Sequence, residues 1–72
     1  MTLLIATTDT YLTKQPVLED YLPEDQKLKV HTGKVYRGIE LLKTEGKHAQ
    51  FNLGNENGVW WLWLPHWSGA DL

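Results

Sequence analysis

The chain of 72 residues carries a net charge of −2 and contains no cysteine. Its length allows one domain, which we place at residues 1–72, and the missing cysteines exclude disulfides and thiolate metal sites. The seven Lys and Arg residues are scattered along the sequence, which argues against binding of long nucleic acids because these partners favour a basic stripe or patch.

Turn signals recur at short intervals, a spacing typical of all-β proteins. Residues 2–7 are apolar and rich in β-formers, so they predict a first strand, which residues 10–13 continue after a kink at Asp9. A long loop follows at residues 14–26, punctuated by two prolines and rich in acidic residues. Within it, residues 17–22 predict one helical turn that ends before proline.

The middle of the chain predicts two further strands. Residues 27–31 alternate, with Leu28 and Val30 on one face. Residues 35–44 have an i, i+4 spacing that would also fit a helix. We predict a strand there, because the segment is rich in β-formers and Gly38 weakens a helix.

The last third of the chain predicts a β-hairpin. Residues 47–53 alternate again, with their apolar side chains facing inward. Residues 54–58 read Gly-Asn-Glu-Asn-Gly and predict the hairpin loop, since glycine and asparagine tolerate positive φ. Residues 59–64 form the last long strand, followed by a polar tail. About five strands with short turns predict a small closed or half-closed barrel.

The strand at residues 59–64 is apolar on both faces, because side chains alternate along a strand. The two faces carry Val59, Trp61 and Trp63 against Trp60, Leu62 and Leu64. A small barrel has one core and buries one of these sets. Three explanations stay open for the set with Trp61: a cover made by the loop at residues 16–23, a platform that stacks on sugars, bases or peptides, or a self-association surface.

The second explanation predicts an aromatic recognition surface as the binding site. Its members would be Trp61, Trp63 and Trp67, with Tyr11, Tyr21 or Tyr36. A basic side along the middle strands is a further candidate. Its residues would hold a phosphate or carboxylate if they converge, or else protect an edge strand. They are Lys27, Lys29, Lys34 and Lys43 with Arg37.

Nothing in the sequence has the spacing of a catalytic or metal site. The three histidines, His31, His48 and His66, lie on separate predicted elements, and the one serine, Ser68, lies in the tail. The clustered acids of the long loop would also suit a paired-carboxylate hydrolase, but solvated charge is the usual explanation for acids in a polar loop. They are Glu19, Asp20, Glu24 and Asp25. We therefore expect no enzyme, no metal and no cofactor.

The longest apolar run, residues 59–65, is far too short to span a bilayer, so we expect no membrane span. Residues 1–6 lack the charged region and the cleavage site of a signal peptide. This predicts a cytoplasmic protein, unless the chain is a module of a larger secreted one.

Several short segments follow one another in a characteristic order. They are residues 9–16 (DTYLTKQP), residues 22–30 (LPEDQKLKV) with Gly33 and Tyr36, residues 46–53 (GKHAQFNL), residues 58–61 (GVWW), and the final His66 and Trp67. This order resembles the bacterial SH3-like (SH3b) modules of cell-wall hydrolases, and is similar to accessory domains of cyanobacterial peptidases and amidases. The Asn-Val-Arg opening of that family is missing, and its Gly-Trp-Val near the end is replaced by the Trp-rich run.

The resemblance implies an SH3-like barrel of about five strands with one long Pro-bounded loop. It also implies a non-catalytic module that recognises a cell-wall glycopeptide, such as peptidoglycan, or a polysaccharide, and that is extracellular if it is a fragment of a wall hydrolase. The alternative is a small protein-interaction factor, such as a phage or bacterial inhibitor. That factor would bind a partner protein or self-associate as a homo-oligomer through the Trp-rich strand. A third hypothesis is a barrel that stacks a single nucleotide.

Overall fold

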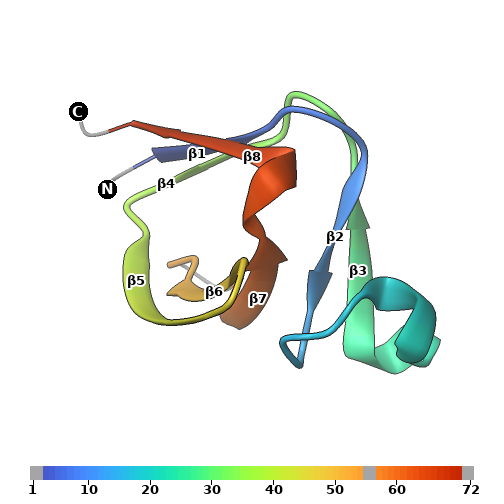
Figure 1. The fold of residues 1–72 in the computed structure, drawn as a ribbon. Helices are drawn as coiled ribbons and strands as arrows, with labels where there is room; N and C mark the ends of the chain where they lie inside the picture. The colour runs from blue at the N-terminus through green and yellow to red at the C-terminus, as the bar shows by residue number, and fades with distance from the viewer. Residues whose placement is uncertain (1–2, 55–56, 71–72) are drawn as a thin grey trace.

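Two antiparallel sheets make up the fold (Figure 1). The computed structural model describes residues 3–54 and 57–70. The strands are β1 (Leu3–Ala6), β2 (Thr10–Thr13), β3 (Lys27–Val30), β4 (Val35–Arg37), β5 (Glu40–Glu45), β6 (His48–Asn52), β7 (Val59–Trp63) and β8 (Trp67–Ala70). The short 3-10 helices are η1 (Glu19–Tyr21), η2 (Glu24–Gln26) and η3 (Leu64–His66).

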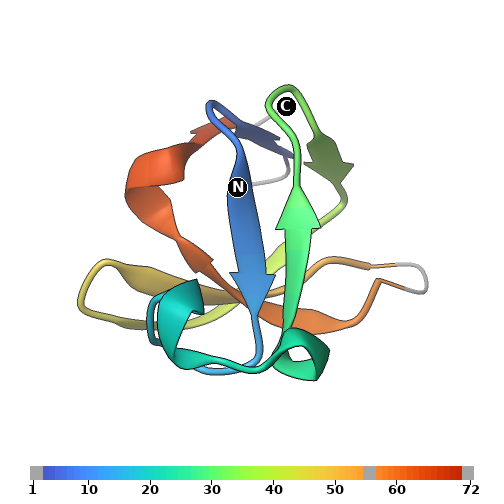
Figure 2. The same ribbon diagram turned by 90° about the vertical axis from the view of Figure 1, so that its right-hand side faces the viewer.

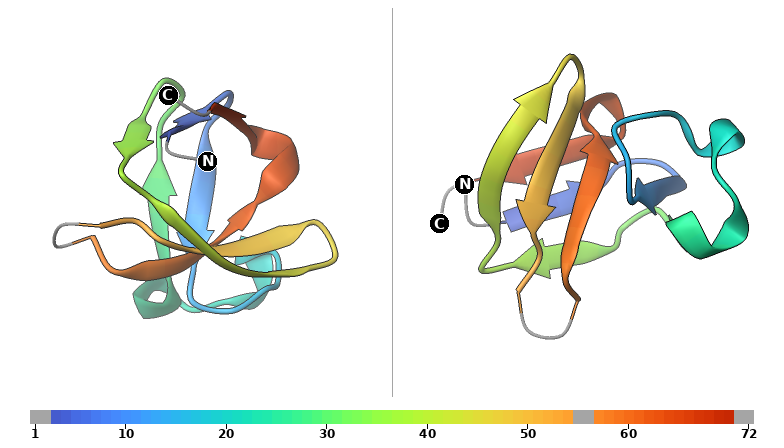
Figure 3. Two further views of the ribbon diagram at one scale, coloured as in Figure 1. Left: turned by 90° about the vertical axis from the view of Figure 1, so that its left-hand side faces the viewer. Right: turned by 90° about the horizontal axis from the view of Figure 1, so that it is seen from below.

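The strands divide into a sheet of three, in the order β4-β1-β8, and a sheet of five, in the order β3-β2-β7-β6-β5. Strands β5, β6 and β7 lie side by side, and the long loop between β2 and β3 lies beyond β7 (Figure 3). The first and last strands pair with each other, since Leu4 lies opposite Gly69. The prediction of a small all-β barrel with one long Pro-bounded loop is confirmed.

The core lies between the two sheets and draws on both. Its most deeply buried large side chains are Leu4, Leu12, Phe51, Leu53 and Leu62. Burying each of them stabilises the fold by about 1.5–3 kcal/mol relative to an exposed side chain. As predicted, the alternating segment of β6 turns its apolar residues inward.

The chain forms eight strands rather than about five, because three predicted segments behave differently. Residues 3–6 and 10–13 join different sheets on either side of Asp9. Gly38, at φ 64°, divides the predicted strand at residues 35–44 into β4 and β5. The expected polar tail forms β8 after η3. Residue 2 of the first predicted strand, and residues 55 and 56 of the hairpin loop, lie outside the described residues.

Candidate functional site

The Trp-rich strand β7 has the two faces that its alternation predicts. Leu62 is completely buried in the core, and Trp60 packs against the edge of the core. Trp61 points to the opposite face, away from the core, yet only 5% of its surface is exposed. Trp63, on the same face, is half-buried. A cover other than the core therefore shields Trp61.

The long loop between β2 and β3 supplies that cover. Where it leaves β2, the Thr13 hydroxyl lies 2.8 Å from the Gln15 carbonyl oxygen and 3.3 Å from the Trp61 carbonyl oxygen. Where it approaches β3, Lys27 Nζ donates to the Glu19 carbonyl oxygen at 3.1 Å. These bonds fix the two ends of the loop. Between them, the Val17 backbone hydrogen-bonds to His48, which lies on the same face of the sheet as Trp61. The structure thus favours the loop cover among the three explanations considered for Trp61.

The covered face continues on β6 with His48. Its side chain is buried, its ring centroid lies 5.0 Å from that of Trp63, and the Val17 backbone of the long loop hydrogen-bonds to it. Burial lowers the pKa of His48 below the ordinary value of 6.5, although the Glu45 carboxylate and the bond to Val17 act in the opposite direction. His48 is therefore buried between β6 and the long loop, in surroundings that favour its neutral form.

The six aromatic residues of the predicted recognition surface occupy three environments. Tyr36 and Trp67 belong to the core and pack with ring centroids 6.0 Å apart. Trp61 lies under the long loop. The other three keep part of their rings accessible, with Tyr21 on η1 78% exposed and the half-buried rings belonging to Tyr11 and Trp63. The fold does not gather the six rings on one open surface.

Lysine ammonium groups lie over four aromatic rings. The closest is Lys14, whose Nζ lies 3.8 Å from the Trp60 ring centroid. The other pairs, at 5.3–5.6 Å, are Lys27 with Tyr11, Lys34 with Tyr36 and Lys43 with Trp61. Such contacts contribute about 0.5–1 kcal/mol at exposed sites. Each ammonium also occupies a ring face on which a sugar or base would stack.

A groove of about 550 Å³ opens beside β3, and its lining residues come from this strand, the turn that follows it, β4 and the β6–β7 connection. Figure 2 shows the course of β2 and β3 at this side of the molecule. Its floor is apolar and consists of Leu28, Val30 and Tyr36. Leu28 is 50% exposed although it faces the core side of the sheet, whereas Val30 and Tyr36 are buried. The rim is polar and consists of Lys29, His31, Thr32, Lys34 and Asn57.

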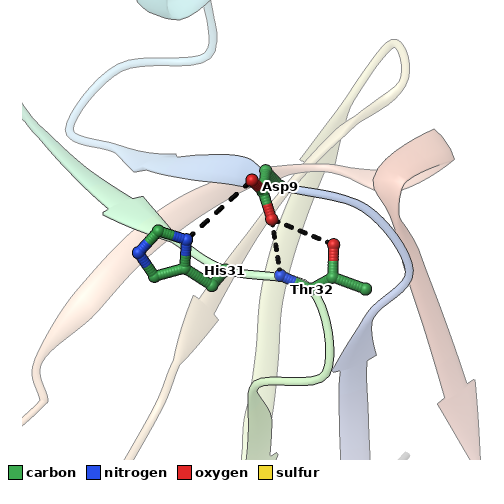
Figure 4. Close-up of polar contacts among 3 residues, drawn as sticks. All are labelled: Asp9, His31 and Thr32. Carbon is green, nitrogen blue, oxygen red and sulfur yellow. Dashed lines mark hydrogen bonds and ion pairs between the residues drawn. The ribbon is translucent and has the colours of Figure 1, made fainter.

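The turn at the head of the groove is fixed by Asp9. One carboxylate oxygen accepts hydrogen bonds from the Thr32 backbone N–H at 2.9 Å and from its hydroxyl at 3.0 Å (Figure 4). The other lies 3.9 Å from His31 Nδ1. The bonds from Thr32, with smaller effects of His31 and Lys29, hold the pKa of Asp9 below its usual range. Asp9 therefore stays ionised and holds the turn that positions the rim.

The rim is cationic. Among the described residues that line the groove, none is acidic, while Lys29 and Lys34 both contribute to it. These two belong to the basic side predicted from the sequence, and the fold brings them to one rim. The other three residues of that prediction, Lys27, Arg37 and Lys43, do not line the groove.

Sequence reasoning did not select most of the groove. Tyr36 was expected at a binding site as a stacking ring, but it forms part of the floor instead. The alternation puts Leu28 on one face with Val30, and it carries no sign that Leu28 stays half-exposed. Asn57 comes from a connection far along the chain, so its approach to β3 depends on long-range packing.

Comparison with known proteins gives no matching family model, no curated relative and no similar solved structure. The described part of the chain contains no group of three or more His, Cys, Asp or Glu residues that could hold a metal ion. Over the same residues, no helix has the length and apolar character needed to cross a membrane.

Proposed function

We propose that this chain is a non-catalytic binding module that holds a cell-wall glycopeptide in the groove beside β3. The observation that carries the proposal is the groove itself, an apolar floor bordered by Lys29 and Lys34 on a chain whose net charge is negative. Ligand sites are typically concave, mostly apolar and furnished with a few placed polar groups.

Wall glycopeptides suit such a site because their peptide parts carry both methyl groups and carboxylates. The order of motifs that resembles SH3b modules supports the same class of ligand. The Trp-rich strand, by contrast, has Trp61 under the long loop and a lysine over the Trp60 ring. The groove therefore supports binding better than the outer face of β7 does.

Titration with soluble muropeptides, followed by amide NMR shifts, tests the proposal. We expect the largest shifts at residues 28–36, and an affinity about ten-fold weaker in each of Lys29→Glu and Lys34→Glu, because a charged hydrogen bond is lost. Lys47→Glu is the matched control: it makes the same charge change on an exposed turn outside the groove, and its affinity should stay within about two-fold. Absence of any shift at residues 28–36 would contradict the proposal.

A second candidate function is protein interaction through β5. Within the described residues this strand pairs with β6 alone, and all six of its residues are exposed. Leu41 and Leu42 are about half-exposed there, which an unpaired edge rarely tolerates without a partner. Light scattering on the muropeptide-free protein decides this point, because self-association through β5 predicts a dimer mass that Leu41→Asn lowers to that of a monomer.

A further inference from the structure

We infer that the part of the ligand held in the groove is an extended, carboxylate-bearing peptide that lies along β3 as an added strand. This inference rests on the proposed function and deepens it, since it assigns the groove to the peptide of a glycopeptide and leaves the sugar outside.

The shape of the groove follows the strand. Its lining includes Leu28, Lys29 and Val30, which are three of the four residues of β3, so the groove runs along this strand. It continues at His31 and Thr32 of the turn that follows. Within the described residues, β3 pairs with β2 on one edge only. Alternate residues of an edge strand direct their backbone N–H and C=O groups away from the sheet, where an extended peptide can pair with them. At about 3.3 Å per residue, the four residues of β3 match a peptide segment of about four residues.

The two sides of an extended peptide match the two sides of the groove. In a strand, alternate side chains point in opposite directions. Small apolar side chains on one side would cover the exposed half of Leu28 and complete the floor. Acidic side chains on the other side would meet Lys29 and Lys34. Asp9, the acid next to this rim, is already engaged by Thr32 and His31, so it competes little for the two lysines.

Among its described residues, the groove lacks the exposed aromatic ring that a sugar would need for binding. Pyranose rings bind by stacking on an open aromatic face. Tyr36 is the aromatic residue of the groove, and only 7% of its surface is exposed. Lys34 Nζ lies over that ring, 5.3 Å from its centroid. The Trp67 ring packs against Tyr36 from within the core. The Tyr36 ring is therefore not accessible for a sugar to stack on, whereas the edge of β3 away from β2 is not paired with another described strand.

Three probes separate the peptide from the sugar. The first is the blocked peptide acetyl-Ala-Glu-Ala-Glu-Ala-amide, which places two carboxylates on one side and methyl groups on the other. The second is its uncharged counterpart acetyl-Ala-Gln-Ala-Gln-Ala-amide, and the third is a peptide-free wall oligosaccharide. Each is titrated into the whole chain with calorimetry and amide hydrogen exchange, beside the muropeptides used above.

We expect the acidic peptide to bind and to slow exchange of alternate amides of residues 28–31 about ten-fold, as strand addition requires. The glutamine peptide should bind about ten-fold more weakly, and the oligosaccharide should leave these amides unchanged. Lys29→Glu and Lys34→Glu should reverse the preference for the acidic peptide, while Lys47→Glu should not.

The possible failures are distinct. If muropeptides and the oligosaccharide shift residues 28–36 but the acidic peptide does not, the inference is overturned and the proposed function stands. The same holds if the acidic peptide binds without protecting any amide of residues 28–31. If no muropeptide shifts the groove, the proposed function itself is overturned.

Discussion

His48 shows at the residue scale how this fold gives one side chain two roles. Its ring packs against that of Trp63 at an interplanar angle of 54° and hydrogen-bonds the Val17 backbone, so it joins β6 to the long loop. Burial favours the neutral ring and lowers the pKa of His48. A proton would have to enter a site covered by the loop.

This burial predicts a dependence of stability on pH. The folded chain binds a proton at His48 less readily than the unfolded chain, in which histidine titrates near 6.5. The stabilisation by neutral His48 is therefore complete above pH 6.5 and declines as the pH falls below that value. Urea unfolding of the parent chain should show this decline in the free energy of unfolding. His48→Gln should lack the part of the decline that comes from His48. His31→Gln, at an exposed histidine, should keep the parent's decline. The prediction is contradicted if the free energy of unfolding falls equally with pH in the parent, His48→Gln and His31→Gln.

At the scale of elements, the long loop acts as the second layer over β7. The alternation of residues 59–64 was enough to predict which tryptophans share a face. The alternation does not decide whether Trp61 lies under a loop cover, on a recognition platform or at a self-association surface. That choice depends on how the long loop folds, through hydrogen bonds such as the one between Lys27 and Glu19, which lie far from β7 in the sequence.

A matched pair of leucines tests the loop as a cover. Leu22 is buried and Leu18 is 43% exposed, although both lie on the long loop. Leu22→Ala should destabilise the fold by about 2 kcal/mol and loosen the loop, so that acrylamide quenches tryptophan fluorescence more strongly. Leu18→Ala, the same change at the exposed position, should alter stability by less than about 0.5 kcal/mol. Unchanged quenching in folded Leu22→Ala would show that the loop does not shield Trp61.

The groove illustrates the limit of prediction at the same scale. The pattern of residues 27–31 correctly predicted a strand, and the lysines were recognised as a candidate anion site. The groove exists, however, because β3 and β4 diverge after the turn that Asp9 fixes, and because Asn57 arrives from the β6–β7 connection. Gly38 is a second example. Its positive φ divides residues 35–44, which the sequence predicts as one strand, into β4 and β5.

At the scale of the whole molecule, the barrel depends on a few large side chains. A core of this size rarely supplies more than about 3–5 kcal/mol of net stability, and the chain has no cysteine for a disulfide. The core side chains come from both sheets, so the loss of one weakens the attachment of each sheet to the other. Stability should therefore be sharply position-dependent even within one strand.

Strand β7 provides the test of this dependence. Leu62 is completely buried and Val59 is 39% exposed. Leu62→Ala should cost about 2–5 kcal/mol, through lost burial and the cavity left behind, which is comparable to the whole stability of the domain. We expect this variant to be largely unfolded at 25 °C by circular dichroism and amide NMR, whereas Val59→Ala should keep the parent spectrum and lose less than about 1 kcal/mol. A cooperative unfolding transition of Leu62→Ala near that of the parent would mean that the sheets are held together by more than this core.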